Sequence, residues 1–328
     1  MGRVAVIDIG TVTCRLGVAD VADGRVSLRS KTSTICNLGE GVAETGALTE
    51  GACERVTSCV RSYLEAAREA GAAWACCTLT SAARDASNAA MLLDGLRDLG
   101  VAPQVIPGEV EGSLTFLGVA QDFPAQRIVV ADNGGGSTEV AVGTLGEHGV
   151  GLEAVRSINV GCRRVTDLFL AQEGPLPADG LRRAREFARD VFARELPAEA
   201  PEACATGRLV CVGGTATTLV AIAHELVPYD PARVHLQSLE LAQVDALAER
   251  LASLPLEERR EVPGLQPKRA DVIVAGSLVV SELMRACRAS ELTVSESDLL
   301  VGLSLATDAA ASGQPSPVAW TPELFSLR

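Results

Sequence analysis

Aromatic and histidine side chains are scarce in this sequence: aromatic residues make up 3% of its 328 residues, and there are three histidines. The hydrophobic fraction is nevertheless 47%, so the core must be built mainly from Val, Leu, Ala and Ile, which suits closely packed α/β layers. None of the ten cysteines forms a CxxC pair, and with so few histidines we expect no zinc site. The sequence also lacks a signal peptide and any apolar run of about 18 residues. We therefore expect a cytoplasmic protein with no membrane segment.

Basic residues are the minority among the charged side chains. There are 29 Lys and Arg against 42 Asp and Glu, which gives a formal net charge of −13. An acidic protein repels nucleic acids and anionic membrane surfaces, so neither is an expected partner. A polyanionic ligand is still compatible with this charge, provided that basic residues gather in one local cleft.

What the sequence does contain is a glycine-rich loop directly after an apolar run at 128–131. The loop comprises the acid Asp132, the glycines Gly134, Gly135 and Gly136, the hydroxyl residues Ser137 and Thr138, and the acid Glu139. Glycine permits positive φ angles and lets a ligand approach the peptide N–H groups, which suits phosphate. The two carboxylates suit a hard cation such as Mg²⁺. The alternative is a plain β-hairpin turn, because Gly-Gly is also common in hairpins.

Two further segments repeat this layout. Near the N-terminus an apolar strand pattern leads into an acid, a glycine and two hydroxyl residues, namely Asp8, Gly10, Thr11 and Thr13. A third apolar run, at 209–212, leads into Gly213 and Gly214 and then into an apolar helix. A helix N-terminus with free N–H groups is a ready anion site, although the same pattern fits a structural strand-to-helix turn. The first two segments together predict a duplicated phosphate-binding hairpin.

Strand and helix patterns alternate along the chain, which indicates an α/β protein. We expect strands at 3–9, 14–20, 25–30, 75–79, 102–106, 127–132, 138–143, 153–158, 209–212 and 292–294. We expect helices at 49–70, 85–99, 110–121, 162–173, 178–194, 214–226, 239–253, 269–287 and 297–310, with Asp85 or Ser87 and Ser238 as N-caps. The second half repeats the first, so we place domains at 1–123 and 124–310, followed by a loosely ordered tail at 311–328.

These segments together resemble the exopolyphosphatase/guanosine pentaphosphate phosphatase family, which belongs to the superfamily of actin, sugar kinases and heat-shock ATPases. The matching stretches are 6–11, 80–86, 106–112, 132–140, 160–166, 212–215, 267–271 and 294–296. They occur in the family's order from about residue 3 to residue 305, and the chain is similar to the short form of the family. The resemblance implies two ribonuclease-H-like, actin-like ATPase domains that flank a central cleft.

The resemblance also implies roles for individual residues. Glu111 matches the family's catalytic glutamate, which would accept a proton from the attacking water. From its residues alone, Glu111 also fits a helix-start acid that favours the helix dipole, as does Glu109. Arg84 and Arg164 match positions at which arginine would bind phosphate in a bidentate fork. The candidate ligands of Mg²⁺ or Mn²⁺ are Asp8, Asp132 and Glu139.

Two positions differ from the family pattern. Val12 stands where members often carry an asparagine, and Asn37 stands where they tend to carry an arginine. Both differences remove a group that would bind a polyanion. Weaker candidates for the path of a long anionic substrate are Arg15, Lys31, Lys268 and Arg269.

The leading hypothesis is a Mg²⁺-dependent exopolyphosphatase, which releases orthophosphate from the end of inorganic polyphosphate. A guanosine pentaphosphate 5′-phosphohydrolase would use the same site, with guanosine penta- or tetraphosphate as its partner. A kinase of the superfamily would use the turn at 213–214 for adenosine and an aspartate as base, whereas this chain offers Glu111. A binding protein for polyphosphate or an alarmone would fit the two departures. A homodimer is one option for its assembly.

Overall fold

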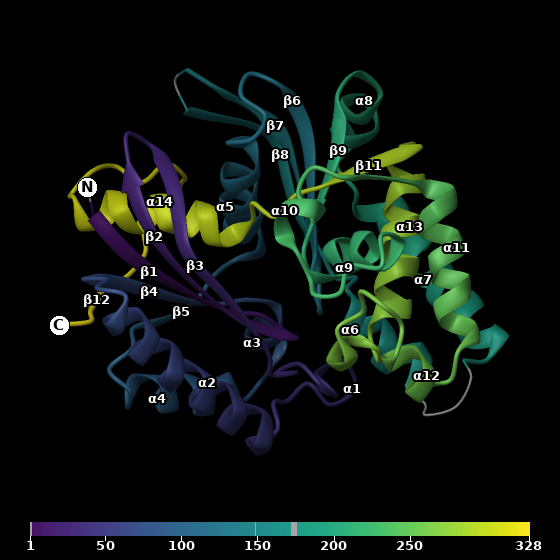
Figure 1. The fold of residues 1–328 in the computed structure, drawn as a ribbon, viewed down its shortest axis with the longest axis horizontal. Helices are drawn as coiled ribbons and strands as arrows, with labels where there is room; N and C mark the ends of the chain where they lie inside the picture. The colour runs from purple at the N-terminus through teal and green to yellow at the C-terminus, as the bar shows by residue number, and fades with distance from the viewer. Residues whose placement is uncertain (1, 148, 172–175) are drawn as a thin grey trace.

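Two mixed β-sheets lie side by side in the computed structural model, which describes residues 2–147, 149–171 and 176–328 (Figure 1). The first sheet has the strand order β12-β4-β1-β2-β3, with β5 paired to β4. Its strands are β1 (Gly2–Ile9), β2 (Thr13–Ala22), β3 (Arg25–Ile35), β4 (Trp74–Leu79), β5 (Pro103–Val105) and β12 (Phe325–Ser326). The second sheet has the order β10-β11-β9-β6-β7-β8. Its strands are β6 (Arg127–Asn133), β7 (Thr138–Gly146), β8 (Gly149–Ile158), β9 (Arg208–Val212), β10 (Ser238–Glu240) and β11 (Glu291–Val294).

The two sheets repeat one topology. Strands β1-β2-β3 and β6-β7-β8 are antiparallel meanders, and the parallel strands β4 and β9 lie beside the first strand of each. The expected duplicated hairpins are therefore present, with Asp8 opposite Arg15 in the first and Asp132 opposite Glu139 in the second. Because directly opposite residues share a face of the sheet, each acid has its partner beside it.

Helices cover the faces of both sheets. In chain order they are α1 (Val42–Thr45), α2 (Glu50–Glu69), α3 (Ser81–Asp85), α4 (Ala89–Arg97), α5 (Gly108–Ala120), α6 (Cys162–Val165), α7 (Ala178–Glu195), α8 (Glu199–Thr206), α9 (Gly214–Ala223), α10 (Pro231–Val234), α11 (Leu241–Ser253), α12 (Leu256–Arg260), α13 (Ile273–Ala286) and α14 (Leu299–Ala311). A π-helical turn spans Thr166–Leu170, and a 3₁₀ turn spans Pro267–Arg269. Within the described ranges, no helix combines the length and apolarity needed to cross a membrane.

Helices α5 and α14 each pack against the sheet of the other half. Phe116 and Val119 of α5 lie in one cluster with Ile128 of the second sheet, whereas Leu300 of α14 packs with Val6 of the first. The two helices also contact each other between the sheets (Figure 1). Strands β1–β5 precede the division between residues 123 and 124 and β6–β11 follow it, but β12 returns to the first sheet and these two helices pack across the division.

Three local expectations differ from the structure because long-range contacts override local signals. The helix expected at 85–99, with Asp85 or Ser87 as its N-cap, is instead two helices: Asp85 ends α3, Ser87 Oγ donates to Gly46 O, and α4 begins at Ala89. Ser238 lies in β10, which pairs with β11, and α11 begins at Leu241. The tail at 311–328 is not loosely attached throughout, because Phe325 pairs with Ala75 at the edge of the first sheet.

Candidate functional site

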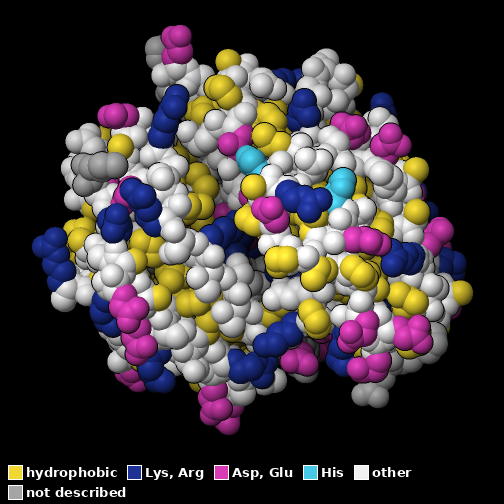
Figure 2. All heavy atoms as spheres, viewed as in Figure 1, with side chains coloured by type: hydrophobic (Ala, Val, Ile, Leu, Met, Phe, Trp, Pro, Cys, Tyr) yellow, Lys and Arg dark blue, Asp and Glu magenta, His cyan; other side chains and the backbone are white. Residues whose placement is uncertain are grey.

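The three glycine-containing turns meet at a small cavity of about 80 Å³ between the two halves. Figure 2 shows Lys and Arg side chains inside the central hollow of this face. Most residues proposed from the sequence line the cavity: Asp8, Gly10, Thr11, Thr13, Glu111, Asp132, Gly134, Gly135, Gly136, Ser137, Gly213 and Gly214. The structure therefore brings together residues that are as many as 261 positions apart, from Asp8 to Arg269.

The glycine triplet is required for close approach and not for unusual backbone angles. None of its three residues has a positive φ, contrary to the expectation from the sequence. Instead, a Cβ on Gly135 would lie 2.7 Å from Val12 Cγ2, and one on Gly136 would lie 2.3 Å from Ser81 Oγ. Without side chains, the second loop can pack directly against the first, which closes the cavity on that side.

The carbonyls of the triplet accept hydrogen bonds from α6. The amides of α6 donate to Gly134 O at 3.0 Å from Cys162 and to Gly135 O at 2.8 Å from Arg163. Arg164 Nε donates to Gly136 O at 2.7 Å. Among the described residues, the amides of Gly135 and Gly136 have no acceptor. Since the N–H of a planar trans peptide points opposite to its C=O, these amides are free to meet an anion.

Two carboxylates in the cavity lack full hydrogen-bond partners. Asp8 Oδ2 accepts from Arg15 at 2.7 and 2.9 Å, but Asp8 Oδ1 is buried without a partner. Asp132 has no side-chain hydrogen bond or ion pair within the part of the chain that is described. Burial raises the pKa of Asp8 despite Arg15, and it raises the pKa of Asp132 to about 7. Burying an unpaired carboxylate oxygen costs free energy, so both Asp8 and Asp132 favour a nearby cation.

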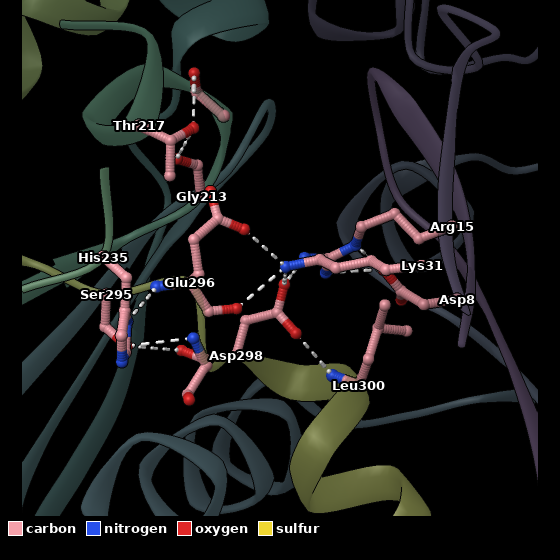
Figure 3. Close-up of polar contacts among 12 residues, drawn as sticks. Asp8, Arg15, Lys31, Gly213, Thr217, His235, Ser295, Glu296, Asp298 and Leu300 are labelled. Carbon is pink, nitrogen blue, oxygen red and sulfur yellow. Dashed lines mark hydrogen bonds and ion pairs between the residues drawn. The ribbon is translucent and has the colours of Figure 1, made fainter. Parts of the chain in front are cut away.

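Arg15 is the centre of an ionic network that joins the two halves (Figure 3). It bonds Asp8 and also Asp298 at 3.0 Å, and Lys31 reaches both Asp298 at 3.0 Å and Glu296 at 3.1 Å. Burial raises the pKa of Asp298, but Lys31 and Arg15 outweigh this effect and lower it. The sequence reasoning missed Asp298. Its signal is an acid directly before an apolar helix, where it caps α14 by accepting from Leu300 N.

Glu111 enters the cavity from the first turn of α5. Gly108 and Gly112 allow this turn to lie on the second sheet, since a Cβ at Gly108 would be 2.1 Å from Ser157 and one at Gly112 would be 2.8 Å from Val155. Glu111 Oε2 accepts from Arg84 Nη1 at 2.8 Å. Burial, followed by the charge of Glu139, raises the pKa of Glu111 well above its usual range. A carboxylate with a raised pKa in a cavity has the properties of a general base.

Apart from the weaker candidates Lys31 and Lys268, four of the residues proposed from the sequence do not line this cavity. Thr138 Oγ1 donates to Val160 O at 2.6 Å, and Glu139 accepts from Ser137 and Ser157 at 2.6 and 2.7 Å. Arg84 bonds Glu111 and Ile106 O, and Arg164 bonds Gly136 O and pairs with Asp85. These four side chains are therefore placed to hold the groups that reach the cavity.

Arg269, one of the weaker candidates, lines the cavity, whereas the neighbouring Lys268 is exposed. The Arg269 guanidinium lies over Gly214, where a Cβ would be 2.1 Å from Nη1, and it donates to Thr13 Oγ1 at 3.3 Å. Within the described residues it has no carboxylate within 4.0 Å, and burial lowers its pKa. A desolvated guanidinium without a carboxylate partner is a strong anion-binding group.

A larger pocket of about 620 Å³ opens beside the cavity and shares Arg15, Gly213, Gly214 and Arg269 with it. One wall is apolar and contains Leu226, Val227, Pro228, Tyr229 and Leu265. The lining also includes Lys31, Glu296 and Asp298 of the ionic network (Figure 3), and the Tyr229 hydroxyl donates a hydrogen bond to Glu296 Oε1. This pocket has the mixed lining of a small-molecule site.

Comparison with known proteins agrees with this arrangement. Residues 17–305 match the model of the Ppx/GppA phosphatase family. The chain is 34% identical to exopolyphosphatase 2 of Mycobacterium tuberculosis over 319 residues, which covers 92% of this chain and 98% of that protein. It is also 30% identical, over 92% of its length, to a bifunctional 3-dehydroquinate synthase/phosphatase of Fusobacterium nucleatum, of which it covers 46%.

Solved structures show the same fold. The Aquifex aeolicus member of the Ppx/GppA family superposes with a TM-score of 0.75 at 30% identity, covering 96% of this chain and 99% of that one. An exopolyphosphatase-like protein superposes with a TM-score of 0.84 at 28% identity, covering 92% of this chain and 96% of that one. The expected fold of two actin-like domains and the expected enzyme class, a phosphoanhydride hydrolase, are confirmed. The chain belongs to the Ppx/GppA phosphatase family.

Proposed function

We propose that this enzyme removes the terminal phosphate of inorganic polyphosphate by attack of a water molecule that Glu111 activates. One observation carries the proposal: a buried carboxylate with a raised pKa shares an 80 Å³ cavity with the free amides of the glycine triplet. Its similarity to a mycobacterial exopolyphosphatase supports polyphosphate as the substrate. We place its activity in the cytoplasm.

Asp8 and Asp132 fit a hard divalent cation, Mg²⁺ or Mn²⁺, because Asp8 Oδ1 is orphaned and the Asp132 carboxylate has no partner among the described residues. Once bound, the cation would neutralise phosphate charge and polarise the phosphoryl group. Glu139 would act indirectly, because both serines that bond it leave its carboxylate outside the cavity lining. It would orient Ser137, which does line the cavity.

The chain's own residues would supply the proton transfer and the binding of the phosphoryl oxygens. Glu111 would accept the proton of the water, and Arg84 would fix the direction of that carboxylate through its 2.8 Å bond. The amides of Gly135 and Gly136 and the guanidinium of Arg269 would bind the phosphoryl oxygens as negative charge develops. Such preorganised donors are worth the most in a cavity that excludes water.

A second candidate is hydrolysis of guanosine pentaphosphate at its 5′ phosphate. The pocket of about 620 Å³ favours it, because an apolar wall has no use in binding a bare polyphosphate chain but can hold a nucleoside. The phosphates would still lie in the smaller cavity, since the two spaces share Arg15 and Arg269. The chemistry at Glu111 is the same for both substrates.

Release of phosphate by the purified chain with Mg²⁺ tests both candidates, with polyphosphate and guanosine pentaphosphate as parallel substrates. Glu111→Gln should lower turnover by about 10²–10⁴-fold, because it keeps the shape of the side chain and removes the base. Glu109→Gln is the matched control, since Glu109 lies in the same helical turn but is exposed. Equal activity of the two variants would contradict the assignment of the base. Tight binding without release by the wild type would identify a sensor instead.

A further inference from the structure

Three buried thiols converge on the far side of the first phosphate hairpin, outside the active site. Cys14 lies on β2, Cys36 follows β3, and Cys59 lies on α2. Their Sγ atoms all lie within 4.8 Å of one another, and all three side chains are buried. They come from three different elements, so the fold itself brings them together.

We propose that Cys14, Cys36 and Cys59 form a binding site for a soft metal ion, Cu(I), coordinated by three thiolates. Metal–thiolate bonds of about 2.3 Å around a planar centre would place the three sulfurs about 4 Å apart. The observed spacing of 4.8 Å or less therefore needs a contraction of under about 1 Å to reach this geometry. Thiolate ligands select soft ions such as Cu(I), whereas Mg²⁺ and Mn²⁺ prefer oxygen.

The number of ligands separates Cu(I) from zinc. Structural zinc sites are almost always tetrahedral and need four protein ligands. In the described parts of the chain, the group contains these three cysteines and no fourth histidine, cysteine or carboxylate. The nearby hydroxyl of Tyr63 is already engaged, because it donates to Cys14 O and lies 2.8 Å from Thr34 Oγ1. A three-coordinate ion fits this set without any additional ligand.

The burial of the three thiols determines how an ion would bind and from which side it would enter. All three thiols are buried, and their Sγ atoms lie within 4.8 Å of one another before any ion is bound. Each thiol that coordinates the ion would release its proton to solvent. Cys59 is 8% exposed and Cys14 is 0% exposed, so an ion would enter from the α2 side.

The site adjoins the catalytic machinery without belonging to it. The amide of Cys36 donates to Val12 O at 2.9 Å, and Cys14 follows Thr13 of the first hairpin. An ion that joins these cysteines to α2 would therefore fix the base of that hairpin. The inference does not depend on which phosphate substrate the enzyme uses.

Anaerobic titration of the full chain with Cu(I), supplied as its acetonitrile complex, tests the proposal. After desalting against a chromogenic Cu(I) chelator, the wild type should retain one ion per chain, and X-ray absorption should show a shell of three sulfurs. Cys59→Ser should lose this ion, and the matched control Cys53→Ser should keep it. Cys53 is also buried on α2 and is 7% exposed, but it is not part of the cluster.

Thermal unfolding gives a second test of Cu(I) binding, and a second variant covers the case in which the first does not fold. Cu(I) should raise the thermal unfolding midpoint of the wild type and of Cys53→Ser, but not that of Cys59→Ser. If Cys59→Ser fails to fold, Cys36→Ser replaces it, with the same expected loss. The proposal is overturned if the wild type retains no Cu(I), if Cys59→Ser and Cys53→Ser retain it equally, or if Zn²⁺ displaces Cu(I) from the wild type.

Discussion

Replacing Gly302 with alanine tests how the crossing of α5 and α14 positions the catalytic base. A Cβ at Gly302 would lie 1.9 Å from the carbonyl oxygen of Leu114, which is backbone and has no freedom to rotate away. Real Cβ contacts begin at about 3.0 Å, so the two helices would have to separate by about 1 Å. Gly118 has the same role from the other helix, since a Cβ there would lie 2.2 Å from Asp298 O.

The expected cost follows from this separation. Overpacking of a core typically lowers the free energy of unfolding by about 1–3 kcal/mol. For domains of this size class, each kcal/mol lowers Tm by roughly 2–4 °C. Leu114 lies one helical turn after Glu111, so a shift of α5 also moves the base. Misplacement by about 1 Å can lower turnover by about 100-fold.

Thermal unfolding and phosphate release by Gly302→Ala are the two assays, with Gly51→Ala as the control. Gly51 also lies in a helix, but a Cβ there would come no closer than 3.7 Å to Arg55, so the control should gain up to about 1 kcal/mol from helix propensity. Wild-type stability and wild-type turnover in Gly302→Ala would show that the helices do not need this contact. A loss of stability with full turnover would separate the packing from the positioning of Glu111.

Three other perturbations address the charges of the site. In protein freed of metal by a chelator, the free energy of unfolding should fall as pH rises toward about 7, because the buried Asp132 holds its proton in the folded state up to its raised pKa. Urea titrations at several pH values should show that the free energy of unfolding depends less on pH in Asp132→Asn. Added Mg²⁺ should restore the stability of the wild type at high pH. Charge reversal in Arg84→Glu should lower kcat equally for long and short polyphosphate, because Arg84 holds Glu111 and does not line the cavity; a defect confined to KM for long chains would contradict this placement. Arg269→Ala should raise KM for both lengths and weaken its salt dependence, and an unchanged KM would exclude Arg269 from phosphate binding.

Local sequence patterns predicted many of the strands and helices of the fold. The apolar runs at 127–132 and 138–143 predicted the hairpin that the structure gives as Arg127–Asn133 and Thr138–Gly146. They succeeded because strand periodicity and glycine turns are properties of neighbouring residues. The expectation for Ser238 was wrong for the opposite reason, since it pairs with Thr293, which is 55 residues away.

Some residues of the candidate site could likewise be predicted from local sequence, and others could not. Asp8, Asp132 and the glycines could be named from their segments, and Glu111 from the family resemblance, because each motif is contiguous. The prominence of Arg15 and Arg269 could not be predicted. Whether a guanidinium is neutralised, as Arg15 is by Asp8 and Asp298, or unpaired, as Arg269 is among the described residues, depends on which carboxylates the fold brings near.

By itself, therefore, the sequence determined the repeated strand–loop–strand units and the residue types that can hold phosphate, since these depend on backbone freedom and side-chain chemistry over a few positions. The tertiary structure alone decided the exchange of α5 and α14 between the sheets, the orphaned oxygen of Asp8 and the convergence of Cys14, Cys36 and Cys59. These features arise from contacts between segments far apart in the chain. Their energies depend on burial and distance, which no local pattern records.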